Sequence, residues 1–290
     1  MASRQQIKRR IQSVKNTRQT TKAMQMVSAS KLRRAQEAAV GPREYARLAR
    51  EILTHLRSIK YGVSPGASLY DERKIKHRVI IMITSDRTLA GAYNSNVIRR
   101  TIKEVMDDEA NHVKTSLICI GRQGARAAAR LKGVEVLGVY QDLPDHLSGS
   151  DLRPILNTVV AKFTDEEVDA VDVIYTGFIS TITQEVRQTR LLPAGFEDEE
   201  VSEDVASAEI EPSIDEVLES ATLRLLDAQL YQMVIESSAS EHAMRMVAMK
   251  NATDNASELI EDYTLEFNNA RQAAITQELA EISAGAEAIS

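Results

Sequence analysis

The sequence is poor in the residues that build thick globular cores. Its 290 residues contain no tryptophan, and aromatic side chains make up only 4%. The single cysteine, Cys119, excludes a disulfide within the chain and fits a reducing compartment. Its apolar neighbours indicate a buried small side chain. This composition favours long helices with aliphatic contact surfaces over an aromatic-rich or disulfide-bonded core.

Long apolar runs are absent as well. No stretch of 18 apolar residues occurs, so no segment is expected to span a membrane. The N-terminal residues lack the apolar core of a signal peptide and show no transit peptide, which favours a bacterial protein. We therefore expect any association with a membrane to occur through partner proteins.

Charge is distributed unevenly along the chain. Residues 1–60 carry 15 Lys and Arg against three Glu, although the whole chain has a net charge of −6. Residues 193–220 carry 11 Asp and Glu and no Lys or Arg. A basic arm can be a solvated helix face, or it can bind nucleic acid, an anionic membrane or an acidic protein. The acidic balance and the lack of interleaved aromatics argue against nucleic acid.

Glycine and proline are missing from residues 213–284. As one helix, these residues would extend about 108 Å at 1.5 Å per residue. Such a length calls for a coiled coil, a membrane span or a repeat, and dispersed polar residues exclude a span. An isolated long helix needs a partner for its apolar stripe. We therefore expect residues 213–290 to form a coiled-coil helix.

The partner expected for this helix lies at the other end of the chain. Residues 1–60 place apolar and small side chains at steps of three or four, which predicts a helix that Gly41-Pro42 should kink or interrupt. The simplest closure is an antiparallel coiled coil of the two terminal helices. Because the second helix is longer, one of its ends should project beyond the first.

Between the terminal helices the pattern changes to short β-branched runs. After a linker at 61–77, residues 78–193 alternate buried strands with helices, and the last two strands form a possible hairpin. This alternation predicts a Rossmann-like α/β domain with a mostly parallel sheet covered on both faces. Residues 194–212 are acidic and poor in apolar side chains, which predicts a mobile linker or an exposed loop.

Signatures of bond chemistry are weak. No phosphate-binding loop is present, and Gly121-Arg-Gln-Gly124 lacks the third glycine of a dinucleotide fingerprint. The five histidines show no metal-ligand spacing, and the cysteine has no placed base. Asp86 follows the first strand, where it could be catalytic but is expected to cap a turn. We expect no cofactor, no metal and no catalytic residue.

Three long motifs carry a family resemblance. Near the N-terminus stand IKRRIQSVKNT at 7–17 and TKAMQMVSASKL at 21–32. The middle motif is SDRTLAGAYN at 85–94. The C-terminal blocks are EHAMRMVAMKNATDNA at 241–256 and NNARQAAITQEL at 268–279. In this order, and over essentially the whole chain, they resemble the ATP synthase gamma subunit.

The resemblance implies a central-stalk rotor that transmits torque and does no catalysis itself. It implies one copy per complex at the cytoplasmic face of a bacterial membrane, with the alpha and beta subunits, the epsilon subunit and the c-ring as partners. It carries over five shaft–hexamer contacts: Met24, Arg245, Arg271, Gln272 and Thr276. Two other classes stay open, a nucleotide-dependent enzyme built on the middle domain and a coiled-coil nucleic-acid or protein adaptor.

Overall fold

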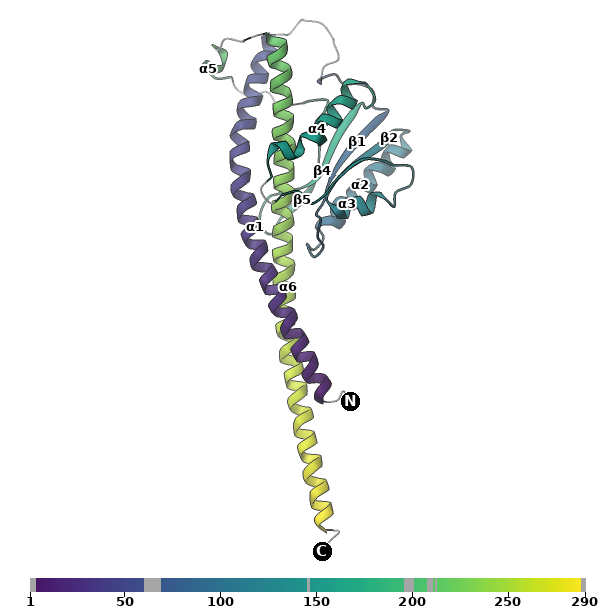
Figure 1. Cartoon of the computed structure of the whole chain (residues 1–290), viewed down its shortest axis with the longest axis vertical. Helices are drawn as coiled ribbons and strands as arrows, with labels where there is room; N and C mark the ends of the chain where they lie inside the picture. The colour runs from purple at the N-terminus through teal and green to yellow at the C-terminus, as the bar shows by residue number, and fades with distance from the viewer. Residues whose placement is uncertain are drawn as a thin grey trace. The chain divides into compact units, whose positions relative to one another are not determined.

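The computed structural model describes residues 4–59, 69–144, 147–195, 201–207, 211 and 213–287. Its elements in chain order are α1 (Arg4–Ile59), β1 (His77–Ile83), α2 (Tyr93–Ala110), β2 (Lys114–Ile120), α3 (Arg122–Ala128), β3 (Glu135–Tyr140), α4 (Gly149–Thr164), β4 (Ala170–Phe178), β5 (Gln184–Leu192), α5 (Glu203–Ala206) and α6 (Ile214–Glu287) (Figure 1). The chain forms two compact units: residues 1–29 with 245–290, and residues 30–244. Both long helices therefore belong to both units.

The larger unit contains a five-stranded sheet in the order β3-β2-β1-β4-β5. Strands β1 to β4 run parallel, and β5 pairs antiparallel with β4 as a hairpin. The mostly parallel sheet and the hairpin predicted from the sequence are confirmed. Parallel strands need crossover connections, and the helices α2, α3 and α4 supply them.

Helices cover both faces of this sheet. On one face, α2 and α3 pack on side chains that alternate along β1, among them Ile80 and Met82. On the other face, α4 and a stretch of α6 pack on Val79, Ile81 and their neighbours. The stretch of α6 contributes Leu226, Leu230, Met233 and Val234 to this core. The long C-terminal helix is therefore also a layer of the α/β domain.

Within the same unit, α1 lies against α6 through small and aliphatic side chains. Ala49 and Leu53 of α1 form a buried cluster with Leu225 and Ala228 of α6. Leu225 and Leu226 are adjacent in sequence but face different neighbours, α1 and the sheet. This part of α6 is therefore buried on two sides, unlike a helix in a simple two-helix coil.

The smaller unit is an antiparallel pair of helical segments. Thr21 lies opposite Thr253, and the Arg10 guanidinium lies 6.0 Å from the centre of the Tyr263 ring. Moving toward the start of α1 therefore means moving toward the end of α6. This pairing confirms the predicted antiparallel coil. It places Arg4, the first described residue of α1, opposite about Asn269 at equal rise in the two helices. The last residues of α6 lie beyond it, as the difference in length predicts.

The structure adds detail at Gly41-Pro42 and in the acidic segment. Helix α1 continues through Gly41-Pro42, so the expected interruption does not occur. A proline inside a helix costs about 3 kcal/mol, and the same helix has buried side chains on either side of it in sequence, Leu32 and Leu53. In the acidic segment, residues 201–207 are folded and include α5, and the Ser202 backbone N–H donates to the Glu51 carboxylate at 2.9 Å.

Candidate functional site

The five residues expected to contact a partner all lie in the smaller unit, on α1 and α6. Met24 is half-buried on α1, and Ser28, one turn later, donates its hydroxyl to the Met24 carbonyl at 2.8 Å. Arg245 is only 7% exposed, so its side chain is largely packed within the protein. Arg271, Gln272 and Thr276 are exposed. The structure therefore divides the five residues into two that are at least half-buried, Met24 and Arg245, and three that are exposed near the end of α6.

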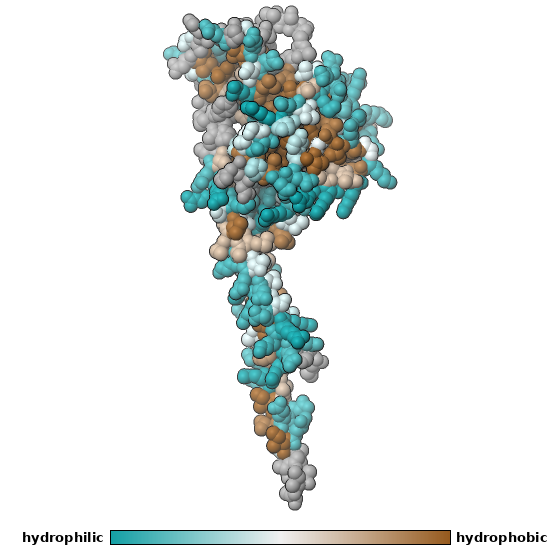
Figure 2. All heavy atoms as spheres, viewed as in Figure 1, coloured by the Kyte–Doolittle hydropathy of each residue, from teal (hydrophilic) through white to brown (hydrophobic). Residues whose placement is uncertain are grey.

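The exposed group lies within an apolar stripe on the end of α6. Leu265 is 64% exposed, and Ile275, Leu279 and Ile282 are also exposed. Figure 2 shows apolar side chains gathered on this last part of the helix. Gln272 lies seven residues from both Leu265 and Leu279, so it shares their face of the helix. Polar side chains thus interrupt an apolar stripe whose part beyond about Asn269 has no described α1 residue opposite it.

Hydrogen bonds at this end are local to the helix. The Thr276 hydroxyl donates to the Gln272 carbonyl at 3.0 Å, and the Gln277 amide donates to the Glu281 carboxylate at 3.0 Å. Both bonds span one turn, and the Gln277–Glu281 side-chain pair stabilises the helix without a second element. The surface can therefore make apolar contact without leaving the Thr276 hydroxyl unbonded.

Two apolar residues beside Met24 escaped the sequence reasoning. Met26 is 63% exposed and Val27 is 57% exposed, although both lie in the part of α1 that pairs with α6. Their sequence positions fall outside the three-and-four spacing of the seam, which is the signal that could have identified them. At 100° per residue, Val27 lies beside Met24 and the two form an apolar patch on α1, whereas Met26 lies on nearly the opposite side of the helix.

The remaining outward surface of α1 in this unit is basic. Lys8, Arg9, Lys15 and Lys22 are exposed. Residues 4–22 carry no Asp or Glu to offset them. An exposed run of one sign attracts the opposite charge over about 10 Å at 0.1 M salt. This surface suits an acidic partner.

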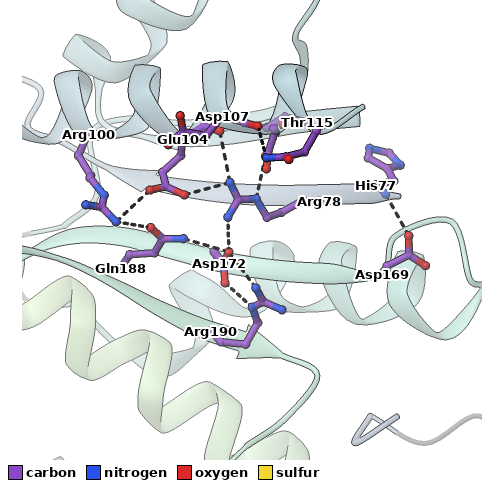
Figure 3. Close-up of polar contacts among 12 residues, drawn as sticks. His77, Arg78, Arg100, Glu104, Asp107, Thr115, Asp169, Asp172, Gln188 and Arg190 are labelled. Atoms are coloured by element: carbon purple, nitrogen blue, oxygen red, sulfur yellow. Dashed lines mark hydrogen bonds and ion pairs between the residues drawn. The ribbon is translucent and has the colours of Figure 1, made fainter. Parts of the chain in front are cut away.

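The α/β domain contains a charge network that the sequence did not predict. Arg78 on β1 donates to Asp108 at 2.8 Å, to Asp172 at 2.9 Å and to Glu104 at 3.1 Å (Figure 3). Asp172 on β4 also accepts from Arg190 on β5 and from Gln188. Asp172 is 1% exposed and Arg78 is 7% exposed. The network joins α2 to three strands of the sheet.

The electrostatics of this network are internally balanced. Burial disfavours the charge on Arg78, but hydrogen bonds and charges from Asp108, Asp172 and Glu104 outweigh it and raise the pKa of Arg78. Every carboxylate of the network has a cationic partner. Arg78 and Asp172 are buried, whereas Arg190 and Arg100, which pair with Asp172 and Glu104, are partly exposed. Removing one charge from such a network would leave a buried partner uncompensated.

Asp86 has a structural role of the kind preferred from the sequence. Its carboxylate accepts hydrogen bonds from the backbone N–H of Arg122 at 2.9 Å and of Asp142 at 3.0 Å. It therefore holds the start of α3 and the segment after β3 at the edge of the sheet. With both oxygens bonded to backbone, Asp86 is not arranged as a general base.

The glycines after β2 serve close packing. A Cβ on Gly121 would lie 2.2 Å from the Thr84 carbonyl oxygen, and one on Gly124 would lie 2.7 Å from the Thr84 hydroxyl. Gly121 also has a φ of +92°, which side chains disfavour. Steric contact with Thr84 explains both glycines without a nucleotide.

Neither a metal cluster nor a membrane helix is found in the part of the chain that the structure describes. No three His, Cys, Asp or Glu side chains converge there as metal ligands would. None of the described helices is both long and apolar enough to cross a bilayer.

The fold and the site together define a class: a protein with an α/β domain and an antiparallel pair of terminal helices, one of which ends in an exposed apolar stripe. Solved structures share this fold. The Euglena gracilis mitochondrial ATP synthase (OSCP/F1/c-ring, rotational state 3) contains a chain with a TM-score of 0.66 at 18% identity, covering 99% of this chain and 94% of that one. The Tetrahymena thermophila mitochondrial central stalk and c-ring structure gives 0.62 at 22% identity, covering 80% and 99%.

Sequence comparison identifies the family within this class. A family model described as ATP synthase matches residues 3–289. The ATP synthase gamma chain of Roseiflexus castenholzii is 39% identical over 289 residues, which are 100% of this chain and 99% of that one. The chain belongs to the ATP synthase gamma chain family.

Family membership settles the class of function. The chain is a central-stalk rotor subunit of an ATP synthase, which transmits torque and so couples proton flow to ATP synthesis or hydrolysis. The subunit is not itself catalytic. The adaptor and the nucleotide-dependent enzyme weighed from the sequence are not favoured.

Proposed function

We propose that the end of α6 turns inside the ring of alternating alpha and beta subunits, and that the catalytic sites lie on those partners. The epsilon subunit and the c-ring bind other parts of the chain, with one copy per complex at the cytoplasmic face of a bacterial membrane. The observation that carries this proposal is the exposed apolar stripe of Leu265, Ile275, Leu279 and Ile282. An exposed stripe of this kind fits burial in a partner.

The chemistry of the stripe suits a rotating contact. Apolar contacts are non-directional, so a turn of the shaft changes them gradually. Hydrogen bonds and ion pairs depend on geometry, so they form in one rotary position and break in the next. Arg271 and Gln272 are the proposed polar contacts of this second type, and Thr276 lies beside them. Coupling is then the difference in contact free energy between rotary positions.

The patch around Met24 and the basic face of α1 are proposed to contact acidic segments of the same ring. Lys15 and Lys22 precede the apolar patch in sequence. Charge steers and orients such a contact, and salt screens it. Arg245 is proposed to act from within the coil, because its side chain is mostly covered.

Co-purification tests the partners. The full chain, expressed with alpha and beta subunits of the same organism, is expected to elute with a hexamer of both and to add epsilon and c-ring when these are present. A chain truncated after Thr264 is expected to bind epsilon but to lose the hexamer. Retention of the hexamer by the truncated chain would contradict the placement of the α6 end.

Paired substitutions test the contacts within the assembled complex. Arg271→Ala with Gln272→Ala is expected to lower ATP-driven proton pumping several-fold more than ATP hydrolysis. Glu278→Ala, an exposed substitution on the same helix end, is the matched control and should leave the ratio unchanged. Met24→Lys should also reduce pumping relative to hydrolysis, because the added cation can form an ion pair that holds one rotary state. Equal ratios in all four proteins would refute these contact residues.

A further inference from the structure

A pair of hydroxyl groups lies in the contact surface between α1 and α6 in the smaller unit. Thr21 Oγ1 and Thr253 Oγ1 are 2.8 Å apart, although the residues are separated by 232 positions in sequence. Thr21 is only 9% exposed, and Thr253 is half-buried. A hydrogen bond therefore joins the two helices where a coiled coil ordinarily places aliphatic side chains.

Counting protons shows that this bond competes with others. The Thr21 hydroxyl also lies 3.1 Å from the Arg18 carbonyl, and the Thr253 hydroxyl lies 2.8 Å from the Met249 carbonyl. Two hydroxyls supply two protons for three bonds. The bond between the helices forms when one threonine donates to its own helix and the other donates across. Either hydroxyl can take either part, so the pair can be satisfied in two ways.

The rest of this contact surface specifies alignment weakly. Its buried side chains include Ile7 near the start of α1, but nearer the threonine pair they are Ser28, Met249 and Ala256, which are small or flexible. Methionine side chains adapt to irregular gaps. Small side chains pack in similar ways in several alignments of the two helices, so they do not favour one of them. A shift of one helix by a heptad, about 10 Å at 1.5 Å per residue, would replace these contacts by similar ones. A single polar position in a coiled-coil seam is a known way to fix register.

We propose that Thr21 and Thr253 form a register key, a polar pair that selects one alignment of α1 along α6. After a heptad shift, Thr21 would face Met246 or Ile260 and would lose its hydroxyl partner. The two threonines are positioning residues: the alignment that they select sets where Met24 lies relative to the residues of α6. This selection acts within the smaller unit, in addition to the packing of α1 on α6 in the larger unit. Its consequence for coupling rests on the proposed function.

Disulfide trapping measures the alignment directly. Val14 and Ile260 each lie seven residues from the threonine pair, so Val14→Cys with Ile260→Cys reports the native register. Val14→Cys with Phe267→Cys reports a shift by one heptad. Cys119 is buried in the sheet and does not compete for oxidation. The reporters are compared in the otherwise native full chain and in a Thr21→Val, Thr253→Val background, which keeps the side-chain shape and removes both hydroxyls.

The expected result is a several-fold rise of the shifted disulfide in the valine background, with helix content unchanged. A Thr21→Ser, Thr253→Ser background keeps the hydroxyls and should restore the native distribution. Should the double valine protein fail to fold, Thr253→Val alone removes the same bond. A native distribution in the valine background would overturn the register key, because no alignment would then depend on the hydroxyls.

Pumping in the assembled complex separates this proposal from the proposed function. Shifted disulfides together with reduced pumping per ATP hydrolysed support both. Shifted disulfides with full pumping support the register key and overturn its effect on coupling. Unshifted disulfides with reduced pumping overturn the key but leave the shaft contacts standing.

Discussion

Replacing Arg78 with methionine tests how much the α/β domain depends on its charge network. The substitution keeps an unbranched side chain of similar reach and removes the cation that Glu104, Asp108 and Asp172 share. Asp172 keeps Arg190, which is partly exposed. Asp108 keeps the Thr115 hydroxyl as a donor at 2.6 Å but loses its guanidinium. The remaining carboxylates then repel one another at the end of α2.

The magnitude follows from the burial of these groups. Removing one partner of a buried ion pair costs about 3–5 kcal/mol, because the other charge stays desolvated without compensation. The residual bonds of Asp172 and Asp108 place the expected loss near the lower end, at about 3 kcal/mol. For a unit of this size, a loss of that order lowers the melting temperature by about 6–12 °C.

Cys119 provides the assay for this domain within the full chain. It lies buried in β2, the strand beside β1, and it is the chain's single cysteine. Labelling with a thiol reagent across a urea series therefore reports unfolding of the sheet and not of the helical unit. The midpoint for Arg78→Met should fall well below that of the native chain.

A matched control and a double variant define the refutation. Lys114 pairs with Glu135 at 3.1 Å on the surface, and Lys114→Met should change stability by less than about 1 kcal/mol. Arg78→Met combined with Asp172→Leu should cost less than the two single changes together, because an apolar pair replaces the ionic one. An Arg78→Met protein within about 1 kcal/mol of the native chain would show that the network is not the stabilising element argued here.

Three further outcomes are expected. Burial raises the pKa of the Cys119 thiol to about 11. At pH 8 the native chain should therefore react with thiol reagents more than about 100-fold more slowly than the unfolded chain. Fast labelling of Cys119 in the native chain would contradict its burial in the strand. The Asp151 carboxylate accepts hydrogen bonds first from the backbone N–H and second from the hydroxyl of Ser148, and these bonds lower the pKa of Asp151. The stability that the ionised carboxylate adds is present at neutral pH and is lost as the pH falls through the lowered pKa. The difference in melting temperature between the native chain and Asp151→Asn should therefore shrink from pH 7 to pH 3. Gly124→Ala places a Cβ 2.7 Å from the Thr84 hydroxyl and 2.9 Å from the Met82 methyl carbon, so it should destabilise the sheet by about 1–3 kcal/mol. Gly149→Ala has open space around the new Cβ and should not destabilise the protein in this way. The urea midpoints of the two variants test this difference.

The strands and helices of the α/β domain could be predicted because their signals are local. Strand β1 is a β-branched run buried on both faces, and such runs arise only where helices cover both sides of a sheet. The sequence predicted strands alternating with helices over 78–193, and the structure has α2 at Tyr93–Ala110 between the first two strands. The spacing of apolar residues and the positions of Gly and Pro indicate the strands and helices without any knowledge of tertiary contacts.

The charge network could not be predicted, because its members are far apart in sequence. Arg78, Asp108 and Asp172 become neighbours only through the strand order β2-β1-β4 and the packing of α2. The sequence contains many Arg and Asp residues, and nothing local distinguishes these from exposed ones. At Gly41-Pro42 the sequence predicted a kink or an interruption, and the structure has a continuous helix there.

The candidate site was predictable as a location but not in its details. The motifs placed Arg271, Gln272 and Thr276 near the end of a long helix, where the structure has them exposed. They did not indicate that Arg245 is packed or that Met26 and Val27 face solvent. A motif identifies which residues belong together in a family, whereas burial depends on which face each residue takes on its helix.

Helix α6 carries two kinds of stability along one continuous element. Between Leu225 and Ala243 many side chains are buried, because α1 and the sheet both pack on the helix there. From 264 to 283 few partners remain, and 12 of the 20 residues are Ala, Leu, Glu, Gln or Arg, the strong helix formers. Bonds across single turns, such as Gln277 to Glu281, add to this local preference. The exposed end therefore holds its helical form without a partner, so a binding partner need not fold it, and its apolar face remains available for contact.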